Sequence, residues 1–298
     1  MTANDYSFNE NNTVIYSGSY EDDESVKCLV IPDGTVEIAE NAFRDFTSIE
    51  SLTLPPSVRV IGASAFSGCK NLKKITLSYG LAEIKDEAFS SCPSLLGVTM
   101  PDSVRYIGEG AFEACAALSF VKLSERCTHI GASAFAFCFN LQQISVPDSC
   151  QRIEFLAFSS CFSLEWVRLS DNITELADSI FEGCRSLKEV DLPTKLVKIG
   201  RRCFKGCSSL SSIILPIGTR SIGYDAFSDC VSLKRIAFPK DLSEIEDMDI
   251  FSGCDALTDI SFGGGREEWD ILTGGKVLSH EKSNLDISTP KVTFMNLK

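Results

Sequence analysis

Hydrophobic residues return along the chain at a fixed interval, and phenylalanine marks that interval most clearly. A phenylalanine occurs every 23 residues from Phe43 to Phe227, and Phe251 follows after a further 24. Up to Phe227, an aliphatic residue lies five positions before each phenylalanine and another lies six positions after it, as Ile38 and Ile49 do around Phe43. Self-similarity at one period indicates a repeat architecture, in which each unit buries its apolar side against the next.

A short stretch of each unit alternates apolar and polar residues with a period of two. Residues 74–77 read Lys-Ile-Thr-Leu, which is typical of a half-buried strand with Ile75 and Leu77 pointing inward. A second apolar stretch, residues 58–62, leads toward the next phenylalanine. Coils stacked at the strand spacing of about 4.8 Å form a parallel sheet over a continuous core. We therefore predict a repeat solenoid of stacked 23-residue coils, mainly β and irregular in structure.

The period also sets the domain organisation. Residues 28–262 hold ten repeats, whereas residues 1–27 and 263–298 depart from the register. The ends of a solenoid expose core and need capping units. We expect an N-terminal cap over residues 1–27 and a C-terminal cap over residues 263–298.

The repeat has a consensus that is best seen in residues 49–118. It reads Leu-x-x-Ile-x-Leu-Pro-x-x-Val-x-x-Ile-Gly-x-x-Ala-Phe-x-x-Cys-x-x. This unit closely resembles the BspA-type, or Treponema pallidum type, leucine-rich repeat, over about 230 residues. Residues 260–269 also resemble the closing unit common in that family.

The resemblance implies a class of function and no particular ligand. Such proteins occur in gut and oral bacteria and in protist parasites, where they are associated with surface attachment, binding of host proteins or aggregation between cells. The family has no catalytic motif to carry over, and its strands are expected to line a concave inner surface. The resemblance therefore favours a protein-binding scaffold, with an adhesive or host-interacting role.

Charge makes two classes of partner poor candidates. The formal net charge is -13 and the sequence pI is near 4.7, so the long-range field repels nucleic acid and anionic membrane surfaces. No apolar run reaches the roughly 18 residues typical of a membrane span, and the N-terminal sequence lacks the pattern of a signal peptide. We expect no nucleic acid partner and no membrane insertion.

Cysteine forms a second column, because nine of the 13 cysteines lie three residues after a phenylalanine of the repeat. None forms a Cys-x-x-Cys pair, and side chains in one column point in parallel, so we expect buried, reduced thiols that pack as small hydrophobic groups. Cys28 falls in an outward column and is the expected accessible thiol. Free thiols favour an intracellular setting, whereas the family resemblance suggests the cell surface, so the localisation stays open.

Catalytic and metal-binding patterns are weak. The chain has two histidines, and Cys127 and His129 are expected to diverge, since Cys127 takes an inward position and His129 a variable one. The glycine run 263–265 has no following Gly-Lys-Ser/Thr and no evident strand-to-helix context, so it is interpreted as a loop into the cap. We expect no enzyme activity, no metal and no cofactor.

Information about a partner must lie in the outward columns, because stacking fixes the inward ones. Two large aromatic residues, Phe120 and Trp166, interrupt an otherwise polar strand face. The candidate protein-binding residues are these two and their neighbours in the same coils: Phe120, Lys122, Gln143, Trp166, Arg168, Phe139 and Phe162. Aromatic and basic residues together are typical of interaction hot spots, and the basic ones suggest an acidic or mixed-charge partner.

Three interpretations of this aromatic cluster stay open. The rings could bind a protein partner, mediate self-association, or fold over the turns as a small local core. The corresponding alternative to a binding scaffold is a self-associating structural rod without an external ligand.

Overall fold

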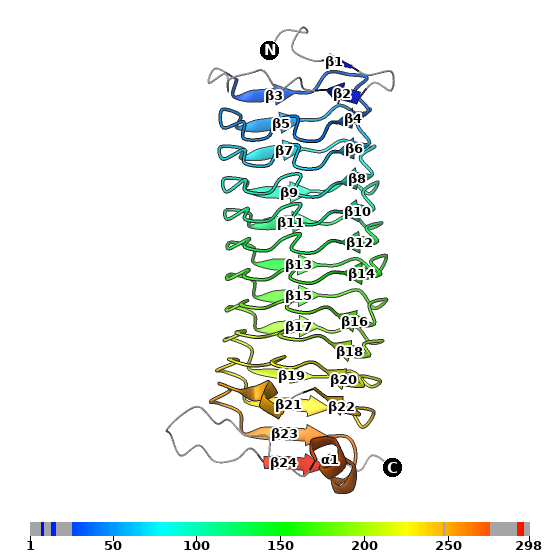
Figure 1. The fold of residues 1–298 in the computed structure, drawn as a ribbon, viewed down its shortest axis with the longest axis vertical. Coiled ribbons are helices and arrows are strands. Elements are labelled where there is room, and N and C mark those ends of the chain that lie inside the picture. Colours follow the sequence, from blue (N-terminus) through cyan, green and yellow to red (C-terminus); the bar gives the residue numbers. More distant parts are fainter. Residues whose placement is uncertain (1–6, 9–12, 16–25, 247, 275–290, 295–298) are drawn as a thin grey trace.

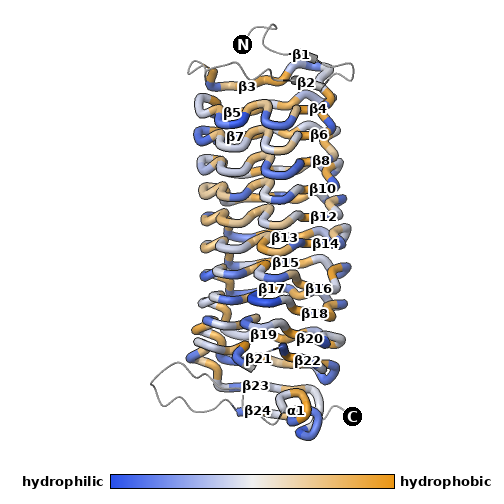
Figure 2. Tube along the Cα trace, viewed as in Figure 1, coloured by the Kyte–Doolittle hydropathy of each residue, from blue (hydrophilic) through white to orange (hydrophobic). Residues whose placement is uncertain are grey.

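The computed structural model is a single solenoid of stacked coils (Figure 1). It describes residues 7–8, 13–15, 26–246, 248–274 and 291–294. Each coil has three sides: a strand of the first sheet, a short strand of the second sheet, and a run of turns that carries the phenylalanine column. Hydrophilic and hydrophobic segments follow one another along the coils (Figure 2). The predicted fold class is confirmed.

The first sheet face is formed by the alternating segments expected from the period-two pattern. Where neighbouring strands of this face pair, they are parallel at an offset of 23 residues, or of 24 between Arg235 and Asp259, so that Gln143 lies beside Trp166. The strands of this face are β3 (Cys28–Val30), β5 (Ser51–Thr53), β7 (Lys74–Thr76), β9 (Gly97–Thr99), β11 (Phe120–Lys122), β13 (Gln143–Ser145), β15 (Trp166–Arg168), β17 (Glu189–Asp191), β19 (Ser212–Ile214), β21 (Arg235–Phe238) and β23 (Asp259–Phe262).

The second apolar stretch of each repeat also forms a strand, which sequence analysis had not assigned. These strands have two residues each and carry the buried aliphatic column of Ile38 and its equivalents. They are β4 (Glu37–Ile38), β6 (Val60–Ile61), β8 (Glu83–Ile84), β10 (Tyr106–Ile107), β12 (His129–Ile130), β14 (Arg152–Ile153), β16 (Glu175–Leu176), β18 (Lys198–Ile199), β20 (Ser221–Ile222) and β22 (Glu244–Ile245).

The hydrogen-bonded ladders are interrupted at three steps within the described part of the chain. The first sheet is broken between β11 and β13 and between β17 and β19, and the second between β14 and β16. The strands β13, β15 and β17 therefore form a separate three-stranded block in the middle of the solenoid.

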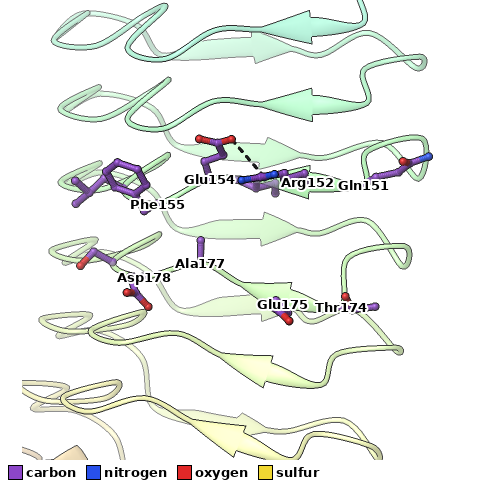
Figure 3. Close-up of a pocket in the computed structure, with 11 residues that line it drawn as sticks. Gln151, Arg152, Glu154, Phe155, Thr174, Glu175, Ala177 and Asp178 are labelled. Carbon is purple, nitrogen blue, oxygen red and sulfur yellow. Dashed lines mark ion pairs between the residues drawn. The ribbon is translucent and has the colours of Figure 1, made fainter.

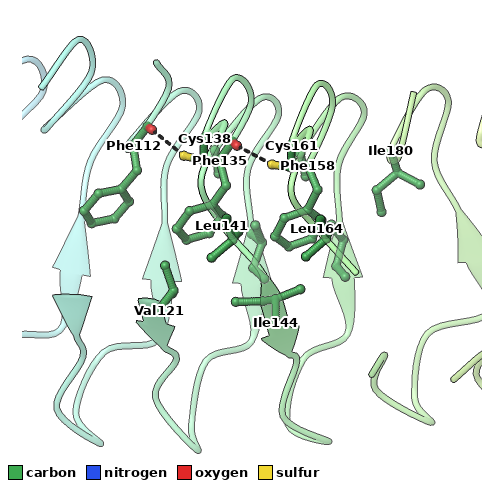
Figure 4. Close-up of a cluster of buried hydrophobic side chains, with 14 of the residues drawn as sticks. Phe112, Val121, Phe135, Cys138, Leu141, Ile144, Phe158, Cys161, Leu164 and Ile180 are labelled. Carbon is green, nitrogen blue, oxygen red and sulfur yellow. Dashed lines mark hydrogen bonds between the residues drawn. The ribbon is translucent and has the colours of Figure 1, made fainter. Parts of the chain in front are cut away.

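The phenylalanine column faces inward, as predicted, and every ring of it is at most 1% exposed. Neighbouring rings of the column stack with centroids between 5.2 Å, for Phe43 and Phe66, and 6.0 Å, for Phe227 and Phe251. Figure 4 shows how these rings and the aliphatic columns fill the space between the sheets. Ile75 is buried and Leu77 is partly buried against the same core, as expected.

The cysteine column is also buried. Twelve cysteines are buried free thiols, and Cys28 is exposed, as the column assignment predicted. Each thiol of the column donates a hydrogen bond to the phenylalanine carbonyl of the preceding coil, as Cys161 does to Phe135 at 3.2 Å (Figure 4). In the first coil Phe46 replaces the cysteine, and its ring packs edge-on against Phe43 at 5.8 Å.

Both ends add elements to the sheets. At the N-terminal end β1 (Ser7–Phe8) pairs with β2 (Thr13–Ile15), and β2 runs parallel to β4. At the C-terminal end a 3-10 helix, η1 (Met248–Phe251), is followed by β23, by α1 (Arg266–Thr273) and by β24 (Lys291–Phe294), which pairs with β23. The cap boundaries at residues 27 and 263 stay predictions.

One expectation about the C-terminal end is wrong. The glycine run 263–265 does lie between a strand, β23, and a helix, α1. However, the carboxylate of Glu268 already accepts the Gly265 N–H at 2.6 Å, and the buried Trp269 packs on Phe262. The first turn of α1 is thus occupied by its own capping residue.

Candidate protein-binding surface

Five of the seven candidate residues lie on the first sheet face. Phe120 and Lys122 come from β11, Gln143 from β13, and Trp166 and Arg168 from β15. They point outward because residues of a strand alternate between its faces, and Val121, Ile144 and Val167 take the inward positions. The Phe120 ring is 51% exposed, and Trp166 is half-buried.

Phe120 lies beside a glycine of the preceding strand. It pairs in register with Gly97, and its Cβ and ring lie about 3.5 Å from the point where a Cβ of Gly97 would be. The missing side chain at Gly97 leaves room for the aromatic ring against the sheet. Half of the ring still faces solvent.

The positive charge of Arg168 is paired within the chain. Its guanidinium contacts both carboxylate oxygens of Asp148 at 3.0 Å and donates to the Val146 carbonyl at 3.1 Å. This paired arginine therefore fixes the edge of the sheet face. Lys122 remains exposed on the neighbouring strand β11.

The other two candidates lie in the turns that precede the strands. Phe139 and Phe162 stack with centroids 4.8 Å apart and an interplanar angle of 11°. Phe137 meets Phe139 edge-on at 6.3 Å, and the Arg185 guanidinium lies over Phe162 at 4.7 Å. Four side chains from three successive coils thus form one aromatic ladder with a cationic end. A ring pair and a cation over a ring each stabilise such an arrangement by about 1 kcal/mol.

An open depression of about 450 Å³ lies where these strands meet the turns that precede them. Gln143 and Trp166 line it from the strands, and Ser163 and Ser186, the residues after Phe162 and Arg185, line it from the turns. Glu165 adds a carboxylate, which pairs with Lys188 at 2.9 Å. We call the strand residues Phe120, Gln143 and Trp166, together with Phe137, Phe139 and Phe162, the aromatic surface.

Sequence analysis missed three parts of this region. It did not identify Arg185, although Arg185 follows Phe139 and Phe162 in one column at a spacing of 23. It did not predict the depression, which depends on how the corner between turn and strand is built. It did not predict the backbone conformation of Phe137, which is left-handed with φ 60°.

The Cys127 and His129 pair is not arranged for catalysis. Cys127 is buried, its thiol donates to the His129 carbonyl at 3.5 Å, and burial raises its pKa to about 11. The His129 ring stacks on Tyr106 at 5.0 Å and lies 3.4 Å from Glu154. Burial lowers the pKa of His129, so the imidazole is held in its neutral form. In the described ranges no three His, Cys, Asp or Glu side chains group as metal ligands, and no helix is long and apolar enough to span a membrane.

Similarity to solved structures agrees with the solenoid. The pneumococcal vaccine antigen PcpA is 23% identical, with 85% of this chain and 76% of that chain covered and a TM-score of 0.58, which shows the shared fold. The Treponema pallidum leucine rich repeat protein is 31% identical over 70% of this chain and 90% of its own, with a TM-score of 0.49. A leucine rich cell surface protein from Faecalibacterium prausnitzii is 24% identical over 95% and 98%, with a TM-score of 0.45. The chain matches no curated protein.

A family model matches most of the chain. The model of the BspA type leucine rich repeat region, which contains six copies of the repeat, matches residues 13–142 and 128–258. These ranges include every coil of the phenylalanine column, which the structure places in one continuous core. The chain therefore belongs to the BspA type leucine-rich repeat family.

Proposed function

We propose that this chain is a protein-recognition scaffold, without enzyme activity, that captures a protein partner through the aromatic surface. The observation that carries the proposal is exposure: Phe120, Phe137 and Phe139 are between 37% and 51% exposed although they lie close along the coils. A local core would bury these rings. Exposed aromatic residues with an arginine beside them have the composition of protein interaction hot spots.

Backbone conformation supports the same proposal. Phe137 adopts φ 60° in a column that is left-handed in every coil, and it is the one bulky residue there, since the other nine coils have glycine four times and Asp, Ser or Ala five times. A bulky residue in the left-handed region costs about 1–2 kcal/mol relative to the usual conformation. An exposed aromatic side chain kept at that cost fits a contact role better than a role in stability.

Local charge also defines the expected partner. Around the depression Arg168 is paired with Asp148 and Glu165 with Lys188. Stacking on aromatic rings and hydrogen bonds to Gln143 and Ser163 are then the available contacts. We expect a partner that buries an apolar or aromatic side chain in the depression, and an adhesive role follows if that partner lies on another cell.

The test compares the wild-type chain with the Phe120→Ala/Trp166→Ala double variant in capture from host and same-cell lysates. We expect the double variant to lose at least one captured protein while its thermal midpoint changes by less than about 3 °C. Tyr79→Ala is the matched control, because Tyr79 is 90% exposed and lies outside the aromatic surface. Identical captured sets, or unfolding of the double variant, would contradict the proposal.

Self-association is the second candidate, favoured by one further apolar side chain on the same sheet face. Ile214 in β19 is 76% exposed and lies in the column of Lys122 and Arg168. In that case the partner is a second copy of the chain. Light scattering over a concentration series separates the two candidates, since a constant monomer mass excludes the self-associating rod.

A further inference from the structure

A second site lies on another side of the solenoid, where the second ladder is open between β14 and β16. In the preceding coil the Gln151 amide donates to Thr128 at 3.0 Å, and the Glu154 amide donates to Ile130 at 2.9 Å. The next coil should make two equivalent bonds, from the Thr174 amide to the Gln151 carbonyl and from the Ala177 amide to the Ile153 carbonyl. Among residues 26–246, the step from β14 to β16 is the one at which these two bonds are absent.

The two coils remain joined on their other two sides. Beside the first sheet, the Glu165 amide donates to the Gln142 carbonyl at 2.8 Å. In the turns, the Phe158 amide donates to the Ile180 carbonyl at 3.0 Å. The gap is therefore local to one side. It forms an open cleft of about 650 Å³, shown in Figure 3.

Sequence explains why the ladder opens at this step. One residue of each coil follows the short strand, and the column reads Ala39, Gly62, Lys85, Gly108, Gly131, Glu154, Ala177, Gly200, Gly223 and Glu246. The glycines of this column pack closely against the backbone of the preceding coil. A Cβ built on Gly200 would come within 2.7 Å of the backbone of Ala177 and Asp178, which is closer than side chains allow. Every step along this column includes at least one glycine, except the step from Glu154 to Ala177. Neither residue of that step is glycine, and the ladder is interrupted there.

The open cleft presents hydrogen-bond acceptors from both walls. In the other coils the carbonyls equivalent to Gln151 and Ile153 accept amides of the next coil, so here they are directed into the gap. Glu175 adds an exposed carboxylate from the opposite wall, and Asp178 lies beside it with one carboxylate oxygen accepting the Arg201 amide at 2.8 Å. An unpaired carbonyl and a carboxylate both call for donors.

The charge of the cleft is negative. Its ionisable residues are three carboxylates and one guanidinium, and that guanidinium, Arg152, lies 3.3 Å from Glu154. Glu175 and Asp178 therefore supply the excess negative charge. Phe155 lines the same cleft and is 48% exposed, so an aromatic face lies beside the acceptors (Figure 3).

We propose that this cleft binds an arginine side chain of a partner protein, at a site separate from the aromatic surface. A guanidinium is flat, carries five N–H donors and stacks on aromatic rings, so it suits a slot with acceptors on both walls and Phe155 at its edge. The chain already makes such a stack elsewhere, with Arg185 over Phe162 at 4.7 Å. A lysine ammonium offers three donors and no flat face, and a carboxylate is repelled.

The test uses three short blocked peptides, Gly-Arg-Gly, Gly-Lys-Gly and the same peptide with neutral citrulline, titrated into the isotope-labelled full chain. We expect the arginine peptide to shift the amide resonances of Thr174, Ala177 and Phe155, and the citrulline peptide to bind at least about tenfold more weakly. The lysine peptide should bind more weakly than the arginine peptide. Equal affinity for the three peptides, or shifts that map away from the cleft, would overturn the proposal.

Two variants test the cleft itself. Ala177→Gly restores a glycine to the step, so we expect the ladder to close, the amide of residue 177 to gain protection from hydrogen exchange, and arginine-peptide binding to be lost. Glu175→Gln keeps the cleft open and should weaken that binding about tenfold or less. Undiminished binding by either variant would overturn the proposal. Trp166→Ala should bind the arginine peptide like the wild type, which separates this site from the aromatic surface.

Discussion

The thiol of Cys138 donates a hydrogen bond to the carbonyl of Phe112, with the sulfur 3.3 Å from the oxygen, although the two residues are 26 positions apart. The same bond recurs from coil to coil, as from Cys115 to Phe89 at 3.2 Å and from Cys207 to Phe181 at 3.3 Å. The thiol thus serves two purposes at one position. It fills a small space in the core, and it gives a second hydrogen bond to a buried carbonyl, since the Phe112 carbonyl also accepts the Cys115 amide at 3.3 Å.

Replacing this thiol separates the two contributions. Cys138→Val keeps a similar volume but removes the donor, so we expect the free energy of unfolding to fall by about 0.5–1.5 kcal/mol, because the Phe112 carbonyl loses one hydrogen bond and keeps that from the Cys115 amide. Chemical denaturation measures this change. Cys28→Val is the control, since Cys28 is exposed and should change stability by less than about 0.5 kcal/mol. An unchanged midpoint for Cys138→Val would show that the bond contributes no stability.

Thiol chemistry should distinguish Cys28 from the other twelve cysteines. Burial raises the pKa of Cys127 to about 11 and that of Cys184 to about 12, so near neutral pH these groups hold almost no reactive thiolate. We expect a small thiol reagent to label one cysteine rapidly in the folded chain and all 13 after denaturation. Cys28→Ser should remove the rapid phase. A rapid phase of several thiols would mean that the cysteine column is open to solvent.

The fold was predictable because one physical constraint repeats in every coil. The interval between Phe43 and Phe66 recurs along the chain, and stacking forces every residue of that column to the same inward position. The two-residue strands were harder to predict. A pair such as Val60–Ile61 is too short to show alternation, and its strand conformation comes from pairing with residues 23 positions away.

The candidate surface was predictable in composition and less so in geometry. Outward columns identified Phe120 and Trp166, because an aromatic residue stands out among polar ones. The pairing of Arg168 with Asp148 could not be predicted from the sequence. The two residues are 20 positions apart, with Arg168 at the end of β15 and Asp148 in the turn after β13. The open step at Ala177 depends on which residues stack on each other, and this becomes readable once the coil-to-coil register is known.

Acid should weaken a contact that spans two coils near the C-terminal end. The Arg201 guanidinium lies 2.8 Å from the Glu246 carboxylate and over the Tyr224 ring at 5.2 Å. The hydrogen bond from Arg201 holds the pKa of Glu246 below its ordinary value of 4.5. Because the folded-state pKa is the lower one, the stabilisation is complete above about pH 4.5 and is lost as the pH falls through the folded-state value.

Glu246→Gln should therefore be less stable than the wild type at neutral pH by about 0.5 kcal/mol, the range of surface ion pairs. The difference should disappear in strongly acidic solution, and high salt should reduce it at neutral pH. Denaturation of both proteins across the pH range measures it. A difference that persists in acid would show that the charge of Glu246 is not its cause.

In the second ladder, every intact step of the column from Ala39 to Glu246 includes at least one glycine. This glycine rule leads to a further prediction. Gly200 abuts Ala177, and its amide donates to Leu176 at 2.8 Å. Gly200→Ala creates a second step without glycine, so we expect β16 and β18 to separate and the free energy of unfolding to fall by about 1–3 kcal/mol, as for other overpacked positions. Hydrogen exchange at residue 200 reports the lost bond directly.

A second substitution, in the neighbouring coil, tests the cause of this loss of stability. It asks whether the loss comes from a step without glycine or from the added methyl group alone. Ala177→Gly combined with Gly200→Ala again places one glycine in the step between coils, and we expect it to regain most of the lost stability and the protection at residue 200. Lys85→Ala is the control, because Lys85 is a non-glycine residue between Gly62 and Gly108 and should change stability by less than about 0.5 kcal/mol. Equal stability of the Gly200→Ala single variant and the double variant would contradict the rule, since the two changes act on the same contact and must then show coupling.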